Sequence, residues 1–461
     1  MSIQARHLTR TRRRARDSPA GRRRQPMAGD GTVSPTKVVI VGGGFGGLAC
    51  ARALAGKALQ VVLVDRHDYH QFTPLLYQVA SALLTAPDIA YPFRAAFRRA
   101  ANVRFCHSTV SSVDLDRRIV HTQGAGDIFY DYLVLATGSE NNYFENASLA
   151  AHTLSMKTLP QAQRLRNHIV ACLERAAQAS QESERRAWLT FVVVGGGPTG
   201  VEFTGALIEL LKLVLGREYP ELAPTLARIV LIEGADRILP AFPERLGRYA
   251  NTILRRRGVE VLTRSLVDRA TPEAVLLSNG AEIASRTIIW SAGIRATELA
   301  GVSGAERTRT RRLQTDDRLR LPGRPEVFAV GDLASVATNG GELPMLSPPA
   351  KQEGRYVADA ILGELRARPL RTPFRYRDKG TMAVIGRNAA VASIWRLRLT
   401  GWAGWIAWLT VHLYYLIGFR NRTVVLVNWA WNYLRKDRPI RMITRIEPDP
   451  LTDEPGPSAA S

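Results

Sequence analysis

Short continuous runs of apolar residues alternate with segments of helical pattern along most of the chain. The run KVVIV from Lys37 leads into GGGFGG, an Ala- and Leu-rich stretch, and then QVVLVD, which ends at Asp65. The same order returns from Phe191, where FVVV leads into GGGPTG, a long apolar helical pattern and RIVLIE, which ends at Glu233. Apolar strands separated by helices are typical of βαβ units around a parallel sheet. The pattern therefore predicts two such units.

Further apolar runs end in glycine and extend the predicted sheets. They are YDYLVLATGS from Tyr130, TIIWSAGIR from Thr287 and VFAVGDLAS from Val327, and a polar, Ala-rich stretch over 157–186 is predicted as one helix. The last strand follows the second βαβ unit, so we expect the first domain to resume there, around an inserted second domain. The predicted fold class is α/β with two Rossmann-like domains, which place ligands at the carboxyl ends of their strands.

The first glycine-rich loop has the spacing of a dinucleotide-binding turn. Gly42, Gly44 and Gly47 follow a strand and precede a helix. In such a loop the first glycine permits the tight turn, the second lets a pyrophosphate approach the backbone, and the third lets the helix pack closely on the strand. Asp65 ends the next strand, where a carboxylate accepts hydrogen bonds from a ribose diol. Strand, loop, helix and acid together argue against a chance Gly-rich hairpin.

The second loop repeats this arrangement. Gly195, Gly197 and Gly200 lie between strand and helix, and Glu233 ends the next strand. A carboxylate at that position repels a 2′-phosphate, so the sequence predicts NADH in preference to NADPH. Arg237 lies four residues further on and could soften that preference.

Two dinucleotide units without a motif for a second substrate indicate FAD in one unit and a nicotinamide cofactor in the other. Reducing equivalents would then pass between the two rings. Gly331 and Asp332 follow a strand beyond the second unit. If the first domain resumes there, Asp332 is placed to bind the ribitol of a flavin held by the first unit. Taken alone, a Gly-Asp turn after a strand is more often only a turn.

Composition adds a strong positive charge and little cysteine chemistry. Lys and Arg total 63 against 41 Asp and Glu, a formal charge of +22, which favours an anionic partner such as nucleic acid or anionic lipid. Coding bias explains part of this charge, because only seven of the basic residues are Lys. No two cysteines have CxxC spacing, which excludes a disulfide scaffold, a thiolate zinc site and a dithiol redox centre. We predict no metal site.

Aromatic and basic residues concentrate after Arg387. Six of the eight Trp fall there, and residues 387–445 hold ten Arg or Lys and one Asp. Residues 399–419 carry no formal charge and are long enough to span a bilayer, but Trp is scattered through their first half, where a spanning helix would confine it to the ends. An amphipathic helical anchor on anionic lipid fits better. The alternatives are a core or homodimer helix, and a nucleic-acid surface, which the aliphatic residues make unlikely.

Several longer segments resemble one family, the type II NADH:quinone oxidoreductases, and the similarity extends over about 37–444. The segments are HQFTPLLYQVAS from His70, YDYLVLATGS from Tyr130, GGGPTGVEFTGAL from Gly195, SAGIRA from Ser291, FAVGDLA from Phe328, YRDKGTMAVIGRNAAVA from Tyr376 and GFRNRTVVLVNWAWNYL from Gly418. The last two are the most discriminating, because general flavin reductases of this fold lack them.

The resemblance implies that the first unit and the Gly-Asp turn hold FAD, that the second unit holds NADH, and that electrons pass to a membrane quinone without proton pumping. Its motifs add Thr137, Gly138 and Gly293 to the expected cofactor-binding residues. It also implies a peripheral position on the cytoplasmic face of a bacterial plasma membrane, with the mitochondrial inner membrane as the alternative.

Three candidate catalytic residues come from the same resemblance. Glu202 matches a glutamate near the flavin and nicotinamide, although an acid in a first helical turn needs no function. Gln352 matches a quinone-side glutamine in LPMLSPPAKQEGRYVA from Leu343. Pro348 and Lys351 depart from the family, which more often has Gln and an apolar residue there. Lys351 is therefore expected either at the quinone site or as a solvated surface lysine.

Two other functions compete with this interpretation. One is a soluble FAD-dependent NADH reductase of a protein acceptor such as ferredoxin, and the other is a redox-sensing flavoprotein with a binding role. Sulfide:quinone oxidoreductases share the fold but need a reactive cysteine pair, and no Cys follows Cys172.

The changes in pattern along the chain also predict its domain boundaries. They are a disordered basic tail over 1–36, an FAD-binding domain over 37–155 and 305–386, an NADH-binding domain over 156–304, a membrane-anchoring module over 387–446 and a disordered tail over 447–461.

Overall fold

The computed structural model describes residues 35–302, 306–338, 341–435, 438 and 441–444. The tail predicted over 447–461 and nearly all of that over 1–36 lie outside these residues. The description that follows concerns the unit that starts at Thr36.

A six-stranded sheet forms the first nucleotide-binding domain, with the order β20-β21-β9-β1-β2-β5. The bounds are β1 Lys37–Val41, β2 Gln60–Asp65, β5 Val103–His107, β9 Tyr132–Leu135, β20 Arg320–Leu321 and β21 Arg324–Ala329. β1 is central and pairs in parallel with β2 and β9, and β21 pairs in parallel with β9. The first domain therefore does resume after the inserted second domain, as the sequence predicts.

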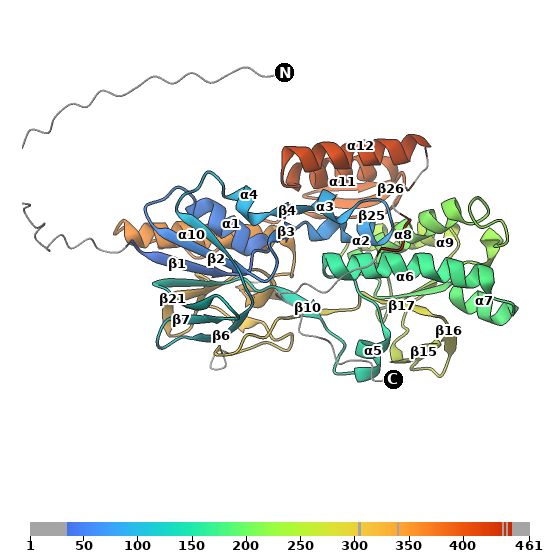
Figure 1. Ribbon diagram of the computed structural model, residues 1–461, viewed down its shortest axis with the longest axis horizontal. Coiled ribbons are helices and arrows are strands. Elements are labelled where there is room, and N and C mark those ends of the chain that lie inside the picture. The colour runs from blue at the N-terminus through green and yellow to red at the C-terminus, as the bar shows by residue number, and fades with distance from the viewer. Residues whose placement is uncertain (1–34, 303–305, 339–340, 436–437, 439–440, 445–461) are drawn as a thin grey trace, which may run out of the picture. The chain divides into compact units, whose positions relative to one another are not determined.

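Two helices, α1 (Phe45–Leu54) and α10 (Ser347–Leu365), pack side by side on this sheet, although they are far apart in sequence (Figure 1). Glycine makes the close approach possible. A Cβ on Gly354 of α10 would lie 2.1 Å from the carbonyl oxygen of Gly46 on α1. This contact brings the strip around Lys351 to the start of α1, at the end of the first glycine-rich loop.

The second domain has a four-stranded parallel sheet with the order β13-β12-β11-β17. Its bounds are β11 Thr190–Val194, β12 Arg228–Ile232, β13 Val259–Leu262 and β17 Thr287–Trp290, with helices α8 Pro198–Val214 and α9 Glu244–Arg256. The single helix predicted over 157–186 is instead two helices, α6 (Leu159–Gln178) and α7 (Glu182–Trp188). Arg185 stabilises the break by donating to the carbonyl oxygens of Ala176 and Ala179.

Short elements complete the two domains. The antiparallel pair β10 (Ser139–Asn141) and β18 (Ile294–Ala296) joins them. The others are β3 Tyr69–Gln71, α2 Leu76–Ala80, α3 Ala86–Ile89, β4 Ala90–Pro92, α4 Phe93–Ala96, β6 Val110–Asp114, β7 Ile119–Thr122, β8 Gly126–Phe129, α5 Ala147–His152, β14 Val267–Ala270, β15 Ala274–Leu277, β16 Glu282–Ala284, β19 Leu313–Gln314, β22 Ala334–Ser335, β23 Ala337–Thr338 and β24 Gly341–Glu342.

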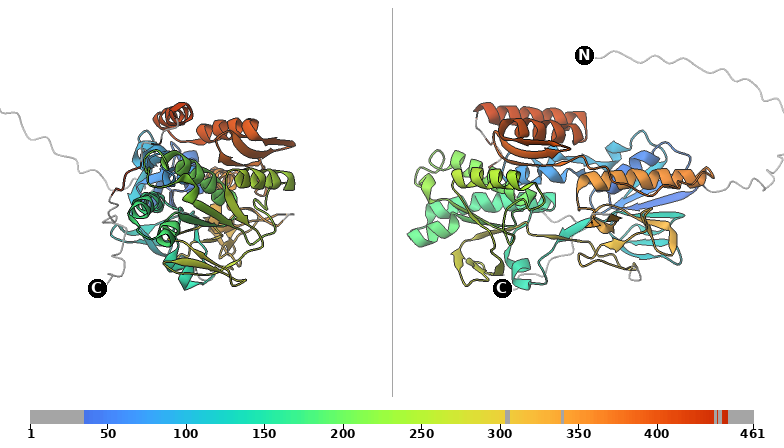
Figure 2. Two further views of the ribbon diagram at one scale, coloured as in Figure 1. Left: turned by 90° about the vertical axis from the view of Figure 1, so that its right-hand side faces the viewer. Right: turned by 180° about the vertical axis from the view of Figure 1, so that it is seen from behind.

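The C-terminal module combines a three-stranded antiparallel sheet with two helices. The bounds are β25 Thr381–Gly386, β26 Ala389–Ile394, β27 Leu397–Thr400, α11 Gly401–Tyr415 and α12 Phe419–Arg435. The uncharged stretch 399–419 is thus not one helix: α11 ends before Gly418, whose φ of +89° favours glycine. The helices α11 and α12 lie beside each other on one side of the two domains (Figures 1 and 2). None of the helices in the described residues is long and apolar enough to cross a bilayer.

Candidate active site

The first glycine-rich loop leaves room at the start of α1. Gly42 has φ +101°, and a Cβ there would lie 2.3 Å from the carbonyl oxygen of Ala136. A Cβ on Gly47 would lie 1.9 Å from the carbonyl oxygen of Gly42. Around Gly44, by contrast, no described atom lies within 4 Å of the Cβ position. The loop is therefore closed toward the sheet and open at the helix N-terminus, where a pyrophosphate would be bound.

Both predicted acids hold the loop that precedes their helix. The Asp65 carboxylate accepts from the N–H of Gly43 at 2.5 Å, and Glu233 accepts from the N–H of Gly196 at 2.6 Å. In the second loop a Cβ on Gly200 would lie 1.9 Å from the carbonyl oxygen of Gly195, while Gly197 again faces open space. The two loops thus have the same construction, and each carboxylate lies at the edge of an open helix N-terminus.

A polar cluster surrounds Asp332 and the turn after β9. The Asp332 carboxylate accepts from the Ser139 hydroxyl and lies 3.7 Å from the Lys157 ammonium, which donates to Ser139 Oγ at 2.7 Å. The Thr137 hydroxyl is buried and has no hydrogen-bond partner within the described part of the chain. Because buried polar atoms are nearly always paired, this orphaned hydroxyl and the open turn at Gly44 fit a flavin nucleotide bound here.

The turns at Gly138 and Gly293 both require glycine, because their φ angles are +76° and +98°. Gly293 follows β17, and a Cβ there would lie 3.0 Å from the Phe144 ring. Its carbonyl oxygen accepts from the Asn142 N–H at 3.2 Å. Gly293 therefore lies where the second sheet meets the connection from the first domain.

Glu202 lies in the first turns of α8, and its side chain is almost completely buried. Its Oε1 accepts from the Trp408 indole N–H of α11 at 3.1 Å and from the Val384 N–H of β25 at 3.3 Å. Burial raises the pKa of Glu202 to about 8, against the two hydrogen bonds, which favour the carboxylate. Glu202 is therefore mostly protonated at neutral pH.

Lys351 is not a solvated lysine. Its ammonium lies over the rings of Tyr415 at 4.2 Å, Phe45 at 4.7 Å and Phe72 at 5.9 Å. Such rings attract a cation through their electron-rich faces. Burial, with smaller contributions from nearby cations, lowers the pKa of Lys351 to about 8. The lysine can therefore lose a proton close to neutral pH.

Gln352 is held by backbone on both sides. Its Oε1 accepts from the Arg377 N–H at 3.0 Å, and its amide N–H donates to the Arg377 carbonyl oxygen at 3.0 Å. In this arrangement the amide fixes the segment before β25, and it is not part of the aromatic cage of Lys351. Helix α11 therefore contacts both Glu202, through Trp408, and Lys351, through Tyr415. The hydrogen bonds of Gln352 described here are instead to the backbone of Arg377.

Sequence reasoning missed three further polar residues of this region. The His70 imidazole is buried next to Gly43, and burial lowers its pKa to about 4, so its Nδ1 donates to the Gly43 carbonyl oxygen at 2.9 Å as a neutral ring. Glu353 accepts from the Gly331 N–H at 2.5 Å, and burial raises its pKa to about 7. Lys157 pairs with Asp332, as described above. Glu353 was detectable as an acid inside the apolar face of α10, whereas no local pattern marks the other two.

A cavity opens beside Glu202, between α8 and the C-terminal module. It contains about 530 Å³ of empty space, including the part open to solvent. On the side of the C-terminal module the wall is aromatic, and at one end it carries Glu209 and arginines. The lining residues include Tyr77, Glu202, Glu209, Arg387, Trp405, Trp408, Trp429 and Arg438.

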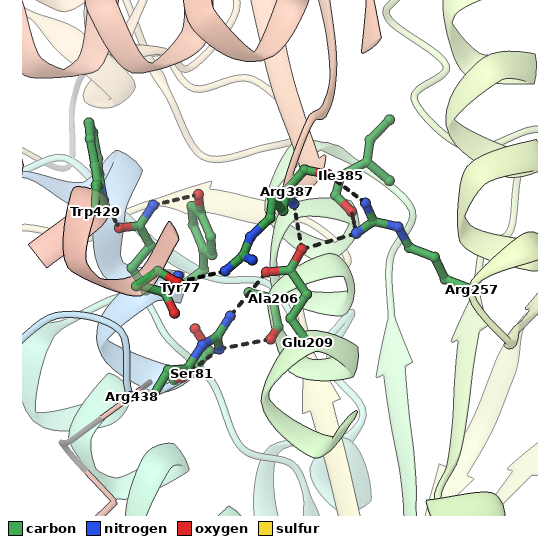
Figure 3. Close-up of polar contacts among 11 residues, drawn as sticks. Tyr77, Ser81, Ala206, Glu209, Arg257, Ile385, Arg387, Trp429 and Arg438 are labelled. Atoms are coloured by element: carbon green, nitrogen blue, oxygen red, sulfur yellow. Dashed lines mark hydrogen bonds and ion pairs between the residues drawn. The ribbon is translucent and has the colours of Figure 1, made fainter. Parts of the chain in front are cut away.

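Glu209 is the centre of the polar network at that end (Figure 3). It accepts from the guanidinium groups of Arg257 at 3.1 Å and Arg438 at 3.2 Å, and from the N–H of Arg387. Arg438 is buried and also donates to the carbonyl oxygens of Ser81 and Ala206. Arg438, which follows α12, is thereby hydrogen-bonded to the end of α2 and to α8.

Comparisons with known proteins agree with this geometry. Two dinucleotide loops in one chain fit a flavoprotein oxidoreductase, and residues 36–354 match the family described as pyridine nucleotide-disulphide oxidoreductase. A type II NADH:quinone oxidoreductase of Mycobacterium tuberculosis is 36% identical over 88% of this chain and 90% of its own length. One of Haemophilus influenzae is 29% identical over 77% of this chain and 86% of its own.

Among solved structures, NDH2 from Plasmodium falciparum in complex with NADH has a TM-score of 0.81 at 20% identity, covering 88% of this chain and 99% of that one. The sulfide:quinone oxidoreductase of Aquifex aeolicus has a TM-score of 0.68 at 18% identity, covering 84% of this chain and 92% of that one. These two likenesses concern the fold. From the sequence relatives, the chain belongs to the type II NADH:quinone oxidoreductase family. The predicted family and fold class are therefore confirmed.

Proposed function

We propose that this protein oxidises NADH and transfers two electrons through FAD to a membrane quinone, without proton pumping. Membership of the type II family and the buried contact between Glu202 and the C-terminal module support this function. The observation that carries it is that α11 contacts residues of both domains. Its Trp408 contacts Glu202 of the NADH-binding domain, and its Tyr415 contacts Lys351 of the FAD-binding domain. A reductase of a soluble protein acceptor has no need of such an aromatic module.

Each cofactor has its own set of residues. Gly42, Gly44 and Gly47, with Asp65, Thr137, Gly138, Gly331 and Asp332, would hold FAD. Gly195, Gly197 and Gly200, with Glu233 and Gly293, would hold NADH. When bound, FAD accepts two electrons from NADH and passes them on singly or as a pair to an acceptor, so the redox chemistry is that of the cofactor.

Two side chains of the protein can exchange protons near neutral pH. Reduction of a quinone to a quinol consumes two protons as well as two electrons. Glu202 holds a proton on its carboxyl until the pH reaches about 8, and Lys351 loses its proton in the same range. A group whose pKa lies near the working pH is best suited to proton transfer. We therefore assign Glu202 and Lys351 to proton supply and charge compensation, and Gln352 to positioning of the neighbouring backbone.

The flavin absorbance of the purified holoprotein tests this function directly. Under anaerobic conditions, NADH should bleach the absorbance, and a short-chain quinone should restore it. Bleaching without recovery on quinone would indicate another acceptor, such as a ferredoxin. If NADH caused no bleaching at all, a binding role of the flavoprotein would become the better explanation.

We further propose that the C-terminal module binds anionic lipid. Its exposed apolar side chains include Trp395, Leu397, Trp402 and Phe419, with exposed fractions of 80%, 59%, 62% and 86%. Exposed arginines flank them, namely Arg396, Arg398, Arg420 and Arg422. Apolar side chains with adjacent positive charge are typical of proteins that lie on an anionic membrane. From the similarity to bacterial relatives we also propose a position on the cytoplasmic face of the plasma membrane.

Sedimentation with vesicles tests the lipid contact. Vesicles with anionic lipid should bind the wild type more tightly than neutral vesicles, and Trp395→Ser with Leu397→Ser should weaken binding. Phe129→Ser removes an equally exposed apolar side chain on β8, outside the module, and should bind as the wild type does. If the double variant instead changes a dimer into a monomer by light scattering and leaves vesicle binding intact, the apolar surface serves a homodimer.

A further inference from the structure

Helix α11 has one inward face that runs between the two candidate proton-exchanging residues. Trp408, His412 and Tyr415 are spaced four and three residues apart, so they lie on the same side of the helix. Trp408 is completely buried, whereas Trp402 and Ile406 of the same helix are exposed. A helix that the sequence assigns to the membrane thus also forms a wall of the active site.

The Trp408 indole is held firmly in this position. His412 stacks on it with ring centroids 4.0 Å apart, and the His412 Nδ1 donates to the Trp408 carbonyl oxygen at 2.8 Å. Trp429 of α12 packs against the other part of the ring, at 5.7 Å between centroids. These contacts fix the direction of the indole N–H independently of its hydrogen bond to Glu202.

The carboxyl of Glu202 depends on this donor. Its two described hydrogen bonds are the one from the Trp408 indole at 3.1 Å and the longer one from the Val384 N–H at 3.3 Å, and both are to Oε1. A buried carboxyl that loses its indole partner keeps only the weaker bond and can rotate toward the cavity. Removal of a hydrogen bond from a buried polar group costs more than the bond itself contributes to stability.

We propose that Trp408 is a positioning residue for Glu202, so that the C-terminal module completes the active site as well as binding lipid. The proposal rests on the function proposed above insofar as Glu202 takes part in the reaction. The contact itself can be tested without turnover.

Other charged or titratable groups face this site, and their titration must be distinguished from that of Glu202. They are Tyr77 on α2, Glu209 on α8, Arg387 between β25 and β26, Arg438 after α12, His412 on α11 and, beyond His412, Lys351 on α10. Of these, Lys351 has a pKa shifted to the range of Glu202. A Glu202→Gln variant removes the acid and leaves all the others, so any titration that survives in it belongs to another group.

Nuclear magnetic resonance of the holoprotein with ¹⁵N-labelled tryptophan measures the contact. The chain has eight indole N–H groups, and Trp408→Phe and Trp429→Phe assign two of their signals. We expect the Trp408 signal to move with pH as Glu202 ionises, and to lose that movement in Glu202→Gln. The Trp429 indole donates to Gln78 at 2.8 Å and is the matched control, whose signal should stay constant.

Quinone reduction supplies the second readout. The indole N–H favours the carboxylate, so Trp408→Phe should raise the pH at which Glu202 ionises, moving the corresponding inflection of kcat upward by about half to one pH unit. Trp429→Phe should leave the inflection unchanged. In the Glu202→Gln background, Trp408→Phe should cause no further shift.

The proposal is overturned if the Trp408 signal is insensitive to pH while Glu202 titrates, or if Trp408→Phe and Trp429→Phe have the same pH profile. If Trp408→Phe folds poorly, the Trp408 signal is instead recognised as the indole signal that moves with pH in the wild type and not in Glu202→Gln, so the test does not depend on that variant. Failure of the proposed function has a different signature, namely flavin that NADH bleaches and quinone does not restore, with the Trp408 titration intact.

Discussion

Single buried side chains decide how this site responds to pH. Glu202 and Glu353 both lie where burial favours the neutral acid, with pKa values raised to about 8 and about 7. A raised pKa in the folded state means that the contribution of the group to stability is complete at low pH, below its unfolded pKa. That contribution is lost as the pH rises through the folded value.

Replacement of Glu202 by Gln tests this sign. The wild type should lose stability relative to Glu202→Gln between about pH 5 and pH 8, because over this range its unfolded chain releases a proton that the buried carboxyl of the folded protein retains. The difference in Tm between the two proteins, measured across this range, gives the result. A constant difference would mean that Glu202 does not titrate there.

The same variant should keep FAD and reduce quinone more slowly. The nucleotide loops do not depend on Glu202, so the flavin spectrum should be unchanged, while loss of a proton-exchanging group typically slows turnover by about 100-fold or more. Flavin content and steady-state kinetics measure the two effects. Turnover equal to that of the wild type would exclude Glu202 from the reaction.

The proposed role of Glu233 in nucleotide preference can be tested by Glu233→Ala. Replacement by Ala removes the carboxylate that we propose binds the ribose diol, and it also releases the N–H of Gly196. The KM for NADH should rise by about tenfold, and NADPH should become relatively better, since one charged hydrogen bond contributes roughly that much. Measured KM values for both nucleotides check this, and an unchanged ratio would exclude the assigned role. Glu260→Gln, on the next strand and exposed, is a suitable control.

At the scale of elements, the contact between α1 and α10 depends on the absence of a side chain. Gly354→Ala places a Cβ against the backbone of Gly46, so the helices must separate. Forcing extra atoms into a well-packed interface costs about 1–3 kcal/mol. We expect a lower Tm and weaker FAD retention, whereas Arg355→Ala, one residue further on and exposed, should change neither. An unchanged Tm would show that the two helices have room to adjust.

At the scale of the whole molecule, the segment after α12 ties the module to both α2 and α8. Arg438→Met removes a buried guanidinium that donates to Ser81, Ala206 and Glu209 (Figure 3). Loss of a buried charged partner costs about 3–5 kcal/mol, so the Tm should fall by several degrees. Arg435→Met removes an exposed arginine at the end of α12 and should have little effect. Equal Tm values for the two variants would contradict this role of Arg438.

The amino-acid pattern alone was enough to predict the two nucleotide-binding units, their glycines and acids, and the resumption of the first domain after the second. These features are local: a tight turn needs glycine at fixed spacing, and a buried parallel strand needs a continuous apolar run. The aromatic and basic character of the C-terminal module is equally visible in the chain.

The contacts of α11 with Glu202 and Lys351, by contrast, became visible only in the folded structure. Trp408 reaches Glu202 across 206 positions of the chain, and Tyr415 closes over Lys351. In the sequence, both aromatic residues have the pattern of a lipid-facing helix, and Glu202 resembles an acid stabilised by a helix dipole. The contacts of Trp408 with Glu202 and Trp429 fix the inward face of α11, and the close approach of Gly46 and Gly354 fixes the position of α10. Such contacts depend on packing between distant elements, so no local pattern in the chain encodes them.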